Sequence, residues 1–373
     1  MKKALMIAPM ASLHRRFNGV NIKVLKDLGY EVHLAANFSV QNGSEAANAE
    51  YEKQCREDGI ITHNIGFYRA ASLKNAAVVK KLAQMIEEGG YDIVHAHSET
   101  GGLLFRLAMK KKRTYKAIYT PHGMSFYKGS SVLSRAVYRP AEKWICSAMD
   151  TNIAMNNEEY AVLEKWNKST ACYVHGIGLD LGKFRDKPDR VQVREKLGIN
   201  DEAVIITAVG ELNKNKNHRV IIEALSKLKN RNVYMFICGV GDLQNELEEM
   251  IRSHGLENRV KLLGYRNDIK DILYASDIFA FPSYHEGLPV SVMEAMCTGL
   301  PVVCSDIRGN NDLIQPQKGG YLCNPDSSDE FCKAVAELIA DETARRKMGA
   351  YNADIIEVYG RENVAAELRE VYV

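Results

Sequence analysis

The first half of the chain alternates short apolar runs with longer amphipathic stretches. The apolar runs have the length and flanking residues of buried β-strands, and they lie at residues 4–8, 31–36, 92–97, 117–120 and 151–154. The stretch 22–28 has the apolar periodicity of a helix and is followed by Gly29, a common helix stop. Strands and helices that alternate at this spacing predict parallel sheets with right-handed crossovers, which is the α/β fold class.

A second unit of the same kind begins near residue 204, with strand-like runs at 204–210, 233–239 and 277–282. Between the two units lies 176–188, rich in glycine and polar residues, which has the composition of a linker. The sequence therefore predicts two domains, 1–182 and 183–360, followed by a final helix at 361–373. Ligands are expected at the carboxyl ends of the strands.

Composition sets limits on the class of protein. With 46% hydrophobic and 26% charged residues, the chain is expected to fold into globular domains. No apolar run approaches the roughly 20 residues that span a bilayer, and residues 1–8 read as a first strand rather than a signal peptide, so we expect a cytoplasmic protein. The eight cysteines form no C-x-x-C pair and no cluster with histidine, which gives little support to a zinc or redox site.

The small net charge of +2 hides an asymmetry between the two halves. Residues 1–180 carry 24 Lys and Arg against 17 Asp and Glu, a net +7, whereas residues 181–373 carry 25 against 30, a net −5. The excess includes Lys110–Arg113 and the aromatic and basic segment Phe126–Trp144. Such a surface suits an anionic membrane or a phosphate-bearing acceptor and predicts peripheral attachment to the inner face of the cell membrane, although an ordinary solvated face explains it equally well. No nucleic-acid motif accompanies the charge, so no nucleic-acid partner is expected.

The most informative stretch is 277–296. A buried strand leads into Gly287, Leu288 and Pro289, which mark the start of a helix with the proline in its first turn. Helix N-termini bind anions, phosphate above all. Glu286 lies on the loop before the helix, and Glu294 lies about two turns along it. A phosphate flanked by carboxylates that accept hydrogen bonds from hydroxyl groups suggests a nucleotide sugar as the ligand. The alternative interpretation is that both glutamates are solvated surface residues.

Residues 283–303, S-Y-H-E-G-L-P-V-S-V-M-E-A-M-C-T-G-L-P-V-V, resemble the E-x7-E signature of the family-4 retaining glycosyltransferases. His122 in T-P-H-G, Lys216 in the segment 210–218, and the segment 263–269 follow in the family's order. The resemblance implies two Rossmann-like domains, the GT-B architecture, facing across a cleft. It further implies that the first domain binds the acceptor, that the second binds the nucleotide sugar, and that the helix 361–373 packs back on the first. Within the family, the chain looks most like bacterial enzymes of capsule, exopolysaccharide or lipid-linked oligosaccharide synthesis.

The resemblance also assigns roles to single residues. Lys216 would bind the diphosphate, Glu294 the ribose hydroxyls, and Glu286 the sugar ring. His122 would lie beside the donor sugar, and His97 is a weaker candidate for the acceptor side. The remaining donor-site residues are the helix start and the loop that holds the base: Gly287, Leu288, Pro289, Val290, Gly264, Tyr265, Arg266 and Asn267.

Two features depart from simple patterns. Glu211 stands where the family most often has arginine, so either Lys216 and the helix start suffice for the diphosphate or another cation substitutes, with Arg266 a candidate. Gly239-x-Gly241 resembles the start of a dinucleotide fingerprint, but Gln244 replaces the third glycine and no acidic residue ends a strand about twenty residues on. A hydride-transfer function is therefore not expected.

The chain contains no D-x-D carboxylate pair for a metal-bridged diphosphate, so we expect activity without a metal or other cofactor. The resemblance to the family implies a retaining transferase that moves a hexose or N-acetylhexosamine from a UDP-sugar to a saccharide acceptor in cell-surface polysaccharide synthesis. It also implies an acceptor linked to undecaprenyl diphosphate. Two alternatives stay open: a UDP-sugar 2-epimerase of the same fold, and a partner protein that binds sugar nucleotides without turnover.

Overall fold

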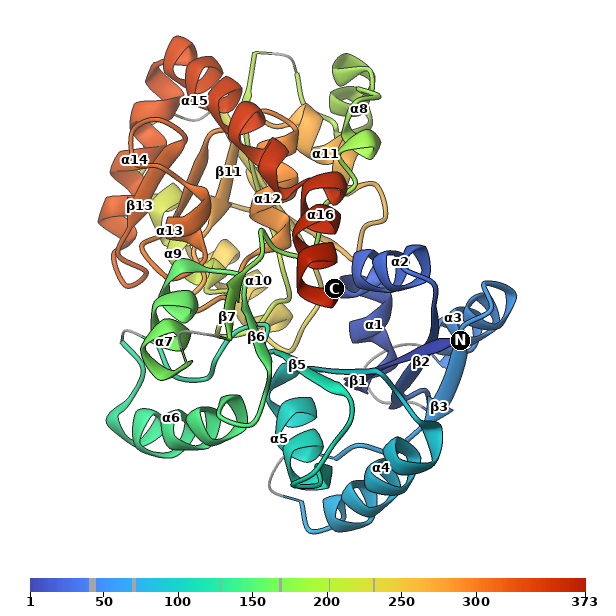
Figure 1. Ribbon diagram of the computed structural model, residues 1–373. Helices are drawn as coiled ribbons and strands as arrows, with labels where there is room; N and C mark the ends of the chain where they lie inside the picture. Colours follow the sequence, from blue (N-terminus) through green and yellow to red (C-terminus); the bar gives the residue numbers. More distant parts are fainter. Residues whose placement is uncertain (40–44, 69–71, 128, 168–169, 201, 231) are drawn as a thin grey trace. The chain divides into compact units, whose positions relative to one another are not determined.

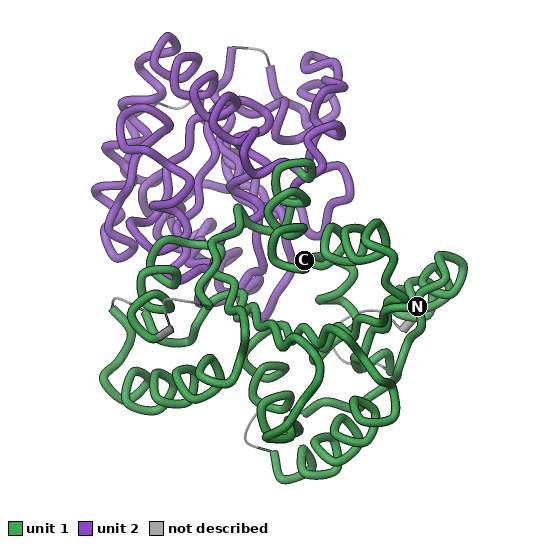
Figure 2. The backbone as a smooth tube through the Cα atoms, in the orientation of Figure 1, with its two compact units in different colours: residues 1–178, 361–373 green, residues 179–360 purple. Residues whose placement is uncertain are grey.

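The computed structural model describes residues 1–39, 45–68, 72–127, 129–167, 170–200, 202–230 and 232–373. The chain divides into two compact units, coloured separately in Figure 2. Unit 1 comprises Met1–Gly178 and Arg361–Val373, and unit 2 comprises Leu179–Gly360. Both contain a parallel sheet with helices packed on its faces, which confirms the predicted α/β class.

Unit 1 is built on a seven-stranded sheet in the order β3-β2-β1-β4-β5-β6-β7, with every described ladder parallel. Its strands are β1 (Lys2–Met10), β2 (Tyr30–Asn37), β3 (Ile61–Asn64), β4 (Ile93–His97), β5 (Lys116–Thr120), β6 (Thr151–Ala154) and β7 (Ala171–Tyr173). Its helices are α1 (Ala11–Phe17), α2 (Gly19–Asp27), α3 (Glu45–Glu57), α4 (Asn75–Gly89), α5 (Ser98–Ala108), α6 (Val132–Cys146), α7 (Asn157–Asn167) and α16 (Arg361–Tyr372).

Successive residues of each central strand belong to two different cores, which is why these strands read as continuous apolar runs. Leu5 and Ile7 of β1 pack in a cluster with residues of α4, α5, α6 and α7. Ala4 and Met6 pack in a second cluster with residues of α2 and α16. The sheet is therefore buried on both faces, as Figure 1 shows.

The C-terminal helix α16 is an integral part of unit 1. It packs against α2, and the hydroxyl of Tyr372 accepts a hydrogen bond from Asn21 Nδ2 at 2.9 Å. Lys116 Nζ, at the start of β5, donates to the carbonyl of Val371 at 2.7 Å. The chain thus returns to the first unit after completing the second.

Unit 2 repeats the same plan with a six-stranded parallel sheet in the order β10-β9-β8-β11-β12-β13. Its strands are β8 (Val204–Val209), β9 (Val233–Cys238), β10 (Val260–Gly264), β11 (Ile278–Phe281), β12 (Val302–Ser305) and β13 (Gly320–Cys323). Its helices are η1 (Leu181–Phe184), α8 (Arg190–Leu197), α9 (His218–Ser226), α10 (Gln244–Ser253), α11 (Ile269–Ala275), α12 (Val290–Cys297), α13 (Asn310–Leu313), α14 (Ser328–Ala340), α15 (Glu342–Ile355) and η2 (Ile356–Tyr359).

The segment expected to be a linker is largely structured. The Leu179 amide donates to the carbonyl of Tyr359 at 2.8 Å, and its side chain packs in a core of unit 2. Leu181–Phe184 then form η1. Burial of Leu179 ties this stretch to unit 2, so the division follows Gly178 instead of the expected Gly182.

In both units the order of strands reverses beside the first strand, between β1 and β4 and between β8 and β11. Loops that leave neighbouring strands in opposite directions part at such a point, and parallel α/β sheets bind their ligands there. In the part of the chain that the structure describes, no helix has both the length and the apolar content that a membrane span requires.

Candidate functional site

Two loops of unit 2 meet where the strand order reverses, one after β8 and one after β11. They bring Lys216 Nζ within 2.6 Å of Glu286 Oε1. The lysine side chain is 21% exposed and the glutamate 14% exposed. The ammonium also lies 4.8 Å from the ring centre of Phe281, a cation–π distance. The structure thus joins the two side chains that the sequence assigned to diphosphate and sugar.

Three asparagines fix the loop that carries Lys216. Asn213 Oδ1 accepts from the Lys216 amide at 2.9 Å, and Asn215 Nδ2 donates to the carbonyl of His285 at 3.0 Å. Asn217 adopts the left-handed conformation, with φ of 51°, and its Nδ2 bridges the carbonyls of Pro282 and Pro325. Asparagine tolerates this conformation better than most residues. The loop after β8 is therefore bonded directly to the loop after β11.

The loop after β11 leads from Glu286 into α12. Pro289 is the N-cap residue and the helix begins at Val290, so the proline directly precedes the first turn, in which it was expected to lie. The side chain of Pro289 makes no capping hydrogen bond. Gly287 and Leu288 precede it, and a Cβ atom on Gly309 would lie 2.5 Å from the Gly287 carbonyl oxygen, which shows how closely the next loop approaches. An uncapped helix N-terminus favours an anion through its amides and dipole.

Glu294, on α12, lies in a pocket of about 630 Å³. Burial raises the pKa of its carboxyl, and the charge of Lys183 opposes that shift. Of the four residues predicted to hold the base, Tyr265, Arg266 and Asn267 line this pocket and Gly264 does not. The complete lining consists of Gly182, Lys183, Phe184, Asp186, Tyr265, Arg266, Asn267, Ile269, Lys270 and Glu294. A carboxylate, cations and an exposed tyrosine in one pocket suit a nucleoside with hydroxyls.

Arg266, the cation expected to substitute for the missing family arginine, has its charge neutralised by Asp268. Arg266 Nε donates to Asp268 Oδ1 at 2.7 Å, and its second nitrogen contacts the other carboxylate oxygen. The pair raises the pKa of Arg266 and lowers that of Asp268. Arg266 lies in the Glu294 pocket, whereas Glu211 is exposed on the loop after β8.

The Gly239-x-Gly241 pattern has a packing explanation. A Cβ atom on Gly239 would lie 1.9 Å from the Gly210 carbonyl oxygen, and one on Gly241 would lie 2.5 Å from that of Leu212. The glycines let the loop after β9 press against the loop after β8. They need no dinucleotide to account for them.

In unit 1 the structure brings together the two histidines that the sequence singled out. His97, the last residue of β4, has its Nδ1 3.0 Å from Nε2 of His122, which follows β5. His97 is 1% exposed, whereas His122 is partly exposed. Burial lowers the pKa of His122 to about 4, so the ring is neutral near pH 7. His97 is thus a buried neighbour of His122.

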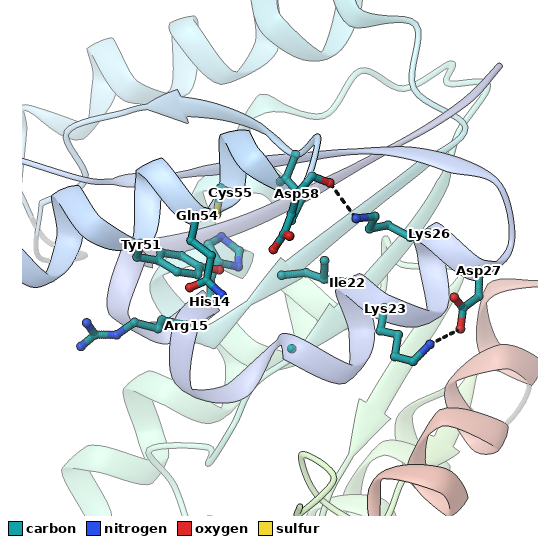
Figure 3. Close-up of a pocket in the computed structure, with 12 residues that line it drawn as sticks. His14, Arg15, Ile22, Lys23, Lys26, Asp27, Tyr51, Gln54, Cys55 and Asp58 are labelled. Carbon is teal, nitrogen blue, oxygen red and sulfur yellow. Dashed lines mark hydrogen bonds and ion pairs between the residues drawn. The ribbon is translucent and has the colours of Figure 1, made fainter. Parts of the chain in front are cut away.

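A separate pocket of about 460 Å³ lies in unit 1 among α1, α2 and α3 (Figure 3). Buried His14 forms part of its wall. Two of its lysines are already bonded, Lys23 to the Asp27 carboxylate and Lys26 to the carbonyl of Asp58. None of the residues predicted for the site lines this pocket.

Several residues at the sites were missed by the sequence reading. Lys183 was assigned to the linker, yet it lines the Glu294 pocket. Arg308, buried after β12, donates from Nε to the carbonyl of Glu286 at 3.1 Å. A polar S-D-I-R-G run directly after a buried strand could have drawn attention to Arg308. The only sequence signal for Asn217 was its position in a polar loop.

Comparison with known families agrees with this geometry. The sequence model of the family described as "Glycosyltransferase Family 4" matches residues 22–181. The sequence model of the family described as "Glycosyl transferases group 1" matches residues 189–354. An Escherichia coli relative is 31% identical over 307 residues, spanning 77% of this chain and 79% of its own. The chain belongs to the family-4 glycosyltransferases.

That Escherichia coli glycosyltransferase is named "UDP-Gal:alpha-D-GlcNAc-diphosphoundecaprenol alpha-1,3-galactosyltransferase". A Bacillus subtilis (strain 168) relative that bears the glycosyltransferase name EpsD is 27% identical, over 100% of this chain and 96% of its own. Both are similar to this protein over most of their length.

Solved structures of the same glycosyltransferase fold superpose on the whole chain. Anabaena Alr3699/HepE in complex with UDP gives a TM-score of 0.80 at 19% identity, covering 100% of this chain and 99% of that one. The same protein with UDP-glucose gives 0.78 at 18% identity, with the same coverage. At this identity the likeness establishes the fold, which is the two-domain GT-B architecture.

Proposed function

We propose that this glycosyltransferase moves a hexose or N-acetylhexosamine from a UDP-sugar to a lipid-linked saccharide, with retention of the donor's anomeric configuration. The observation that carries the proposal is the Lys216–Glu286 pair beside the start of α12, where the N-cap residue Pro289 makes no side-chain capping hydrogen bond. A cation and a helix N-terminus suit a diphosphate, and the Glu294 pocket suits the attached nucleoside. The UDP and UDP-glucose complexes of Alr3699/HepE support the same class of donor.

The chemistry follows from these groups. The bond between the anomeric carbon and the diphosphate oxygen breaks, a bond to the acceptor oxygen forms on the same face, and the acceptor proton passes to the leaving phosphate. Lys216 and the α12 amides would stabilise the negative charge that develops on the leaving group. Glu286 would stabilise positive charge on the sugar ring. His122 would contact the donor sugar.

The sequence has no D-x-D pair, so we propose that the diphosphate is held without a metal ion. Its charge would be balanced by Lys216 and by the α12 dipole. This arrangement would leave the protein dependent on no cofactor other than its nucleotide-sugar donor.

The lipid-linked acceptor is supported by the acceptor in the name of the Escherichia coli relative, a diphosphoundecaprenol saccharide. Such an acceptor lies at a membrane, and we propose that α6 docks there. Five large apolar side chains of α6 are between 41% and 76% exposed: Val132, Leu133, Val137, Tyr138 and Trp144. Exposed cations interleave with them at Arg135, Arg139 and Lys143, whereas the one acidic residue of α6, Glu142, is buried. An amphipathic helix of this composition suits an anionic lipid surface.

The structure favours α6 over Lys110–Arg113 as the main contact. Lys110 pairs with Glu87 and Arg113 with Asp150, so half of that basic run is already neutralised. Phe126, expected to belong to the same surface, is buried. Lys128, which lies between Phe126 and the start of α6 in the sequence, is outside the described residues.

One assay separates this function from its two alternatives. Nucleotide release is measured with a panel of UDP-sugars, with and without a lipid-linked saccharide. A transferase releases UDP in step with acceptor glycosylation. Release that is independent of acceptor, with an epimerised sugar as product, would identify an epimerase. Tight binding without release under either condition would identify a non-catalytic partner.

A further inference from the structure

A cluster of buried histidines lies at the carboxyl ends of β4 and β5, around the predicted sugar-binding His122. The rings of His95 and His97 are 4.0 Å apart between centres, and those of His97 and His122 are 5.2 Å apart. His14 of α1 meets His97 edge-on at 6.2 Å. Burial lowers the pKa of all four imidazoles, so near pH 7 each carries a single ring proton. The position of that proton then decides which nitrogen can donate.

The hydrogen bonds of His95 fix its tautomer. Asn21 Nδ2 donates to the Tyr372 hydroxyl at 2.9 Å, which leaves that hydroxyl to donate its own proton to His95 Nδ1 at 2.8 Å. His95 then carries its proton on Nε2, and Nε2 donates to Thr120 Oγ1 at 2.9 Å. In this series of hydrogen bonds, every donor therefore meets an acceptor.

His97 has one partnered nitrogen and one without a partner. Its Nδ1 lies 3.0 Å from His122 Nε2, whereas its Nε2 is buried and has no hydrogen-bond partner within the described structure. If His97 accepted at Nδ1, its buried Nε2 would carry an unsatisfied N–H. Orphaned buried N–H groups are rarer in proteins than unsatisfied acceptors. The favoured arrangement is therefore donation from His97 Nδ1–H to His122 Nε2.

The backbone around His122 is held independently of this bond. His122 adopts the left-handed conformation, with φ of 60°, which is uncommon for a residue other than glycine. Two residues on, the Met124 amide donates to Glu159 Oε1 at 2.6 Å, and the Ser125 amide donates to Glu99 Oε1 at 2.6 Å. The carboxylates fix the loop, which leaves the orientation and tautomer of the His122 ring to be set by His97.

We propose that His97 is a positioning residue that holds the His122 ring in the tautomer protonated on Nδ1. The remaining ring nitrogen of His122 is then a hydrogen-bond donor and has no lone pair with which to accept a proton. Resting on the proposed function, this makes His122 a donor to an oxygen of the sugar and not a general base. The pair would stay neutral throughout turnover.

The direct test is nitrogen NMR of the full-length protein labelled with ¹⁵N-histidine at pH 7.5. Loss of one signal set in His122→Gln assigns the His122 ring. The proposal expects a protonated Nδ1 and a bare Nε2 for His122 in the wild type. A protonated Nε2 on His122 would overturn it, whether or not any glycosyl transfer is detected, so its failure is distinct from failure of the proposed function.

Variants supply a second readout. His97→Ala removes the donor, whereas His97→Asn replaces it with an amide N–H near the former Nδ1. We expect His97→Ala to mix the His122 tautomers and to lower kcat about tenfold with little change in donor KM, and we expect His97→Asn to restore both properties. His63→Ala, which removes a partly buried histidine bonded to His33 on the neighbouring strand, is the matched control.

Two results with these variants contradict the proposal. One is a His122 tautomer that is unchanged in a folded His97→Ala protein. The other is an equal loss of kcat in His97→Asn and His97→Ala, which would indicate a merely structural role. If His97→Ala does not fold, the wild-type and His97→Asn spectra still decide the tautomer.

Discussion

Lys216 and Glu286 form an ion pair that predicts different effects when either is removed. Lys216→Ala and Glu286→Gln should each lower turnover at least tenfold, about 1.4 kcal/mol of transition-state stabilisation. Lys216→Ala should also weaken UDP binding, because a cation at the diphosphate is lost. Glu286→Gln should leave UDP binding unchanged or tighter, because the lysine is no longer neutralised. Steady-state kinetics and UDP calorimetry check both effects.

Lys214→Ala is the matched control for the lysine, since Lys214 is exposed on the same loop. It should behave as wild type. Wild-type turnover in folded Lys216→Ala and Glu286→Gln proteins would refute the assignment of this pair to the site.

Glu294 is expected to act on binding more than on chemistry. Ribose contacts are similar in the ground and transition states, so Glu294→Ala should weaken UDP affinity more than it lowers the rate of single-turnover transfer. Calorimetry and rapid-quench kinetics provide the two values. Glu249→Ala, an exposed glutamate on α10, is the control. Unchanged affinity for every nucleoside diphosphate tested would remove Glu294 from the donor site.

At the scale of elements, α6 gives the test of membrane docking. Replacing Arg135, Arg139 and Lys143 by Ser should release the protein from phosphatidylglycerol vesicles in co-sedimentation. Each cation near such a surface contributes on the order of 1 kcal/mol, and the attraction is screened within about 8 Å at physiological salt. Val132→Ser with Leu133→Ser should also weaken binding, but with little effect on its salt dependence.

The matched control replaces Lys53, Arg56 and Lys80, three exposed cations elsewhere in unit 1, by Ser. Equal vesicle binding by the α6 variant and the wild type would show that α6 is an ordinary solvated helix. A Lys110–Arg113 variant that alone loses binding would return the surface to that basic run.

The elements were largely predictable because parallel strands buried on both faces leave continuous apolar runs. β6 spans Thr151–Ala154 as expected, and α16 spans Arg361–Tyr372 within the expected 361–373. The linker was predicted less well, since burial of Leu179 depends on the fold of unit 2. The His97–His122 contact was likewise beyond the sequence, because two side chains 25 residues apart meet only through strand pairing of β4 with β5.

For the whole molecule, the buried histidines predict sensitivity to acid. Burial lowers the pKa of His14, His122 and His218 to about 4 and those of His95 and His97 well below 6.5. The unfolded chain binds more protons than the native one once the pH falls below about 6.5, so stability should be lost from there toward pH 4. Raised pKa values of buried Glu142 and Glu294 act in the opposite direction, but these two carboxyls oppose six histidines, because partial burial also lowers the pKa of His63.

Urea unfolding midpoints between pH 7.5 and pH 5 measure this loss of stability. The His63→Ala variant lacks only a partly buried histidine, so its midpoint should fall on acidification nearly as much as that of the wild type. A midpoint that stays constant or rises on acidification would contradict the neutral state of the cluster.

The central claim is transfer from a UDP-sugar to a lipid-linked saccharide with retention and without a metal. The most direct measurement is NMR of the product formed in EDTA from a UDP-α-sugar and an undecaprenyl-diphosphate-linked saccharide. The account predicts an acceptor lengthened by one sugar in α-linkage. A β-linked product would contradict retention, and loss of product in EDTA that magnesium or manganese restores would contradict the metal-free site.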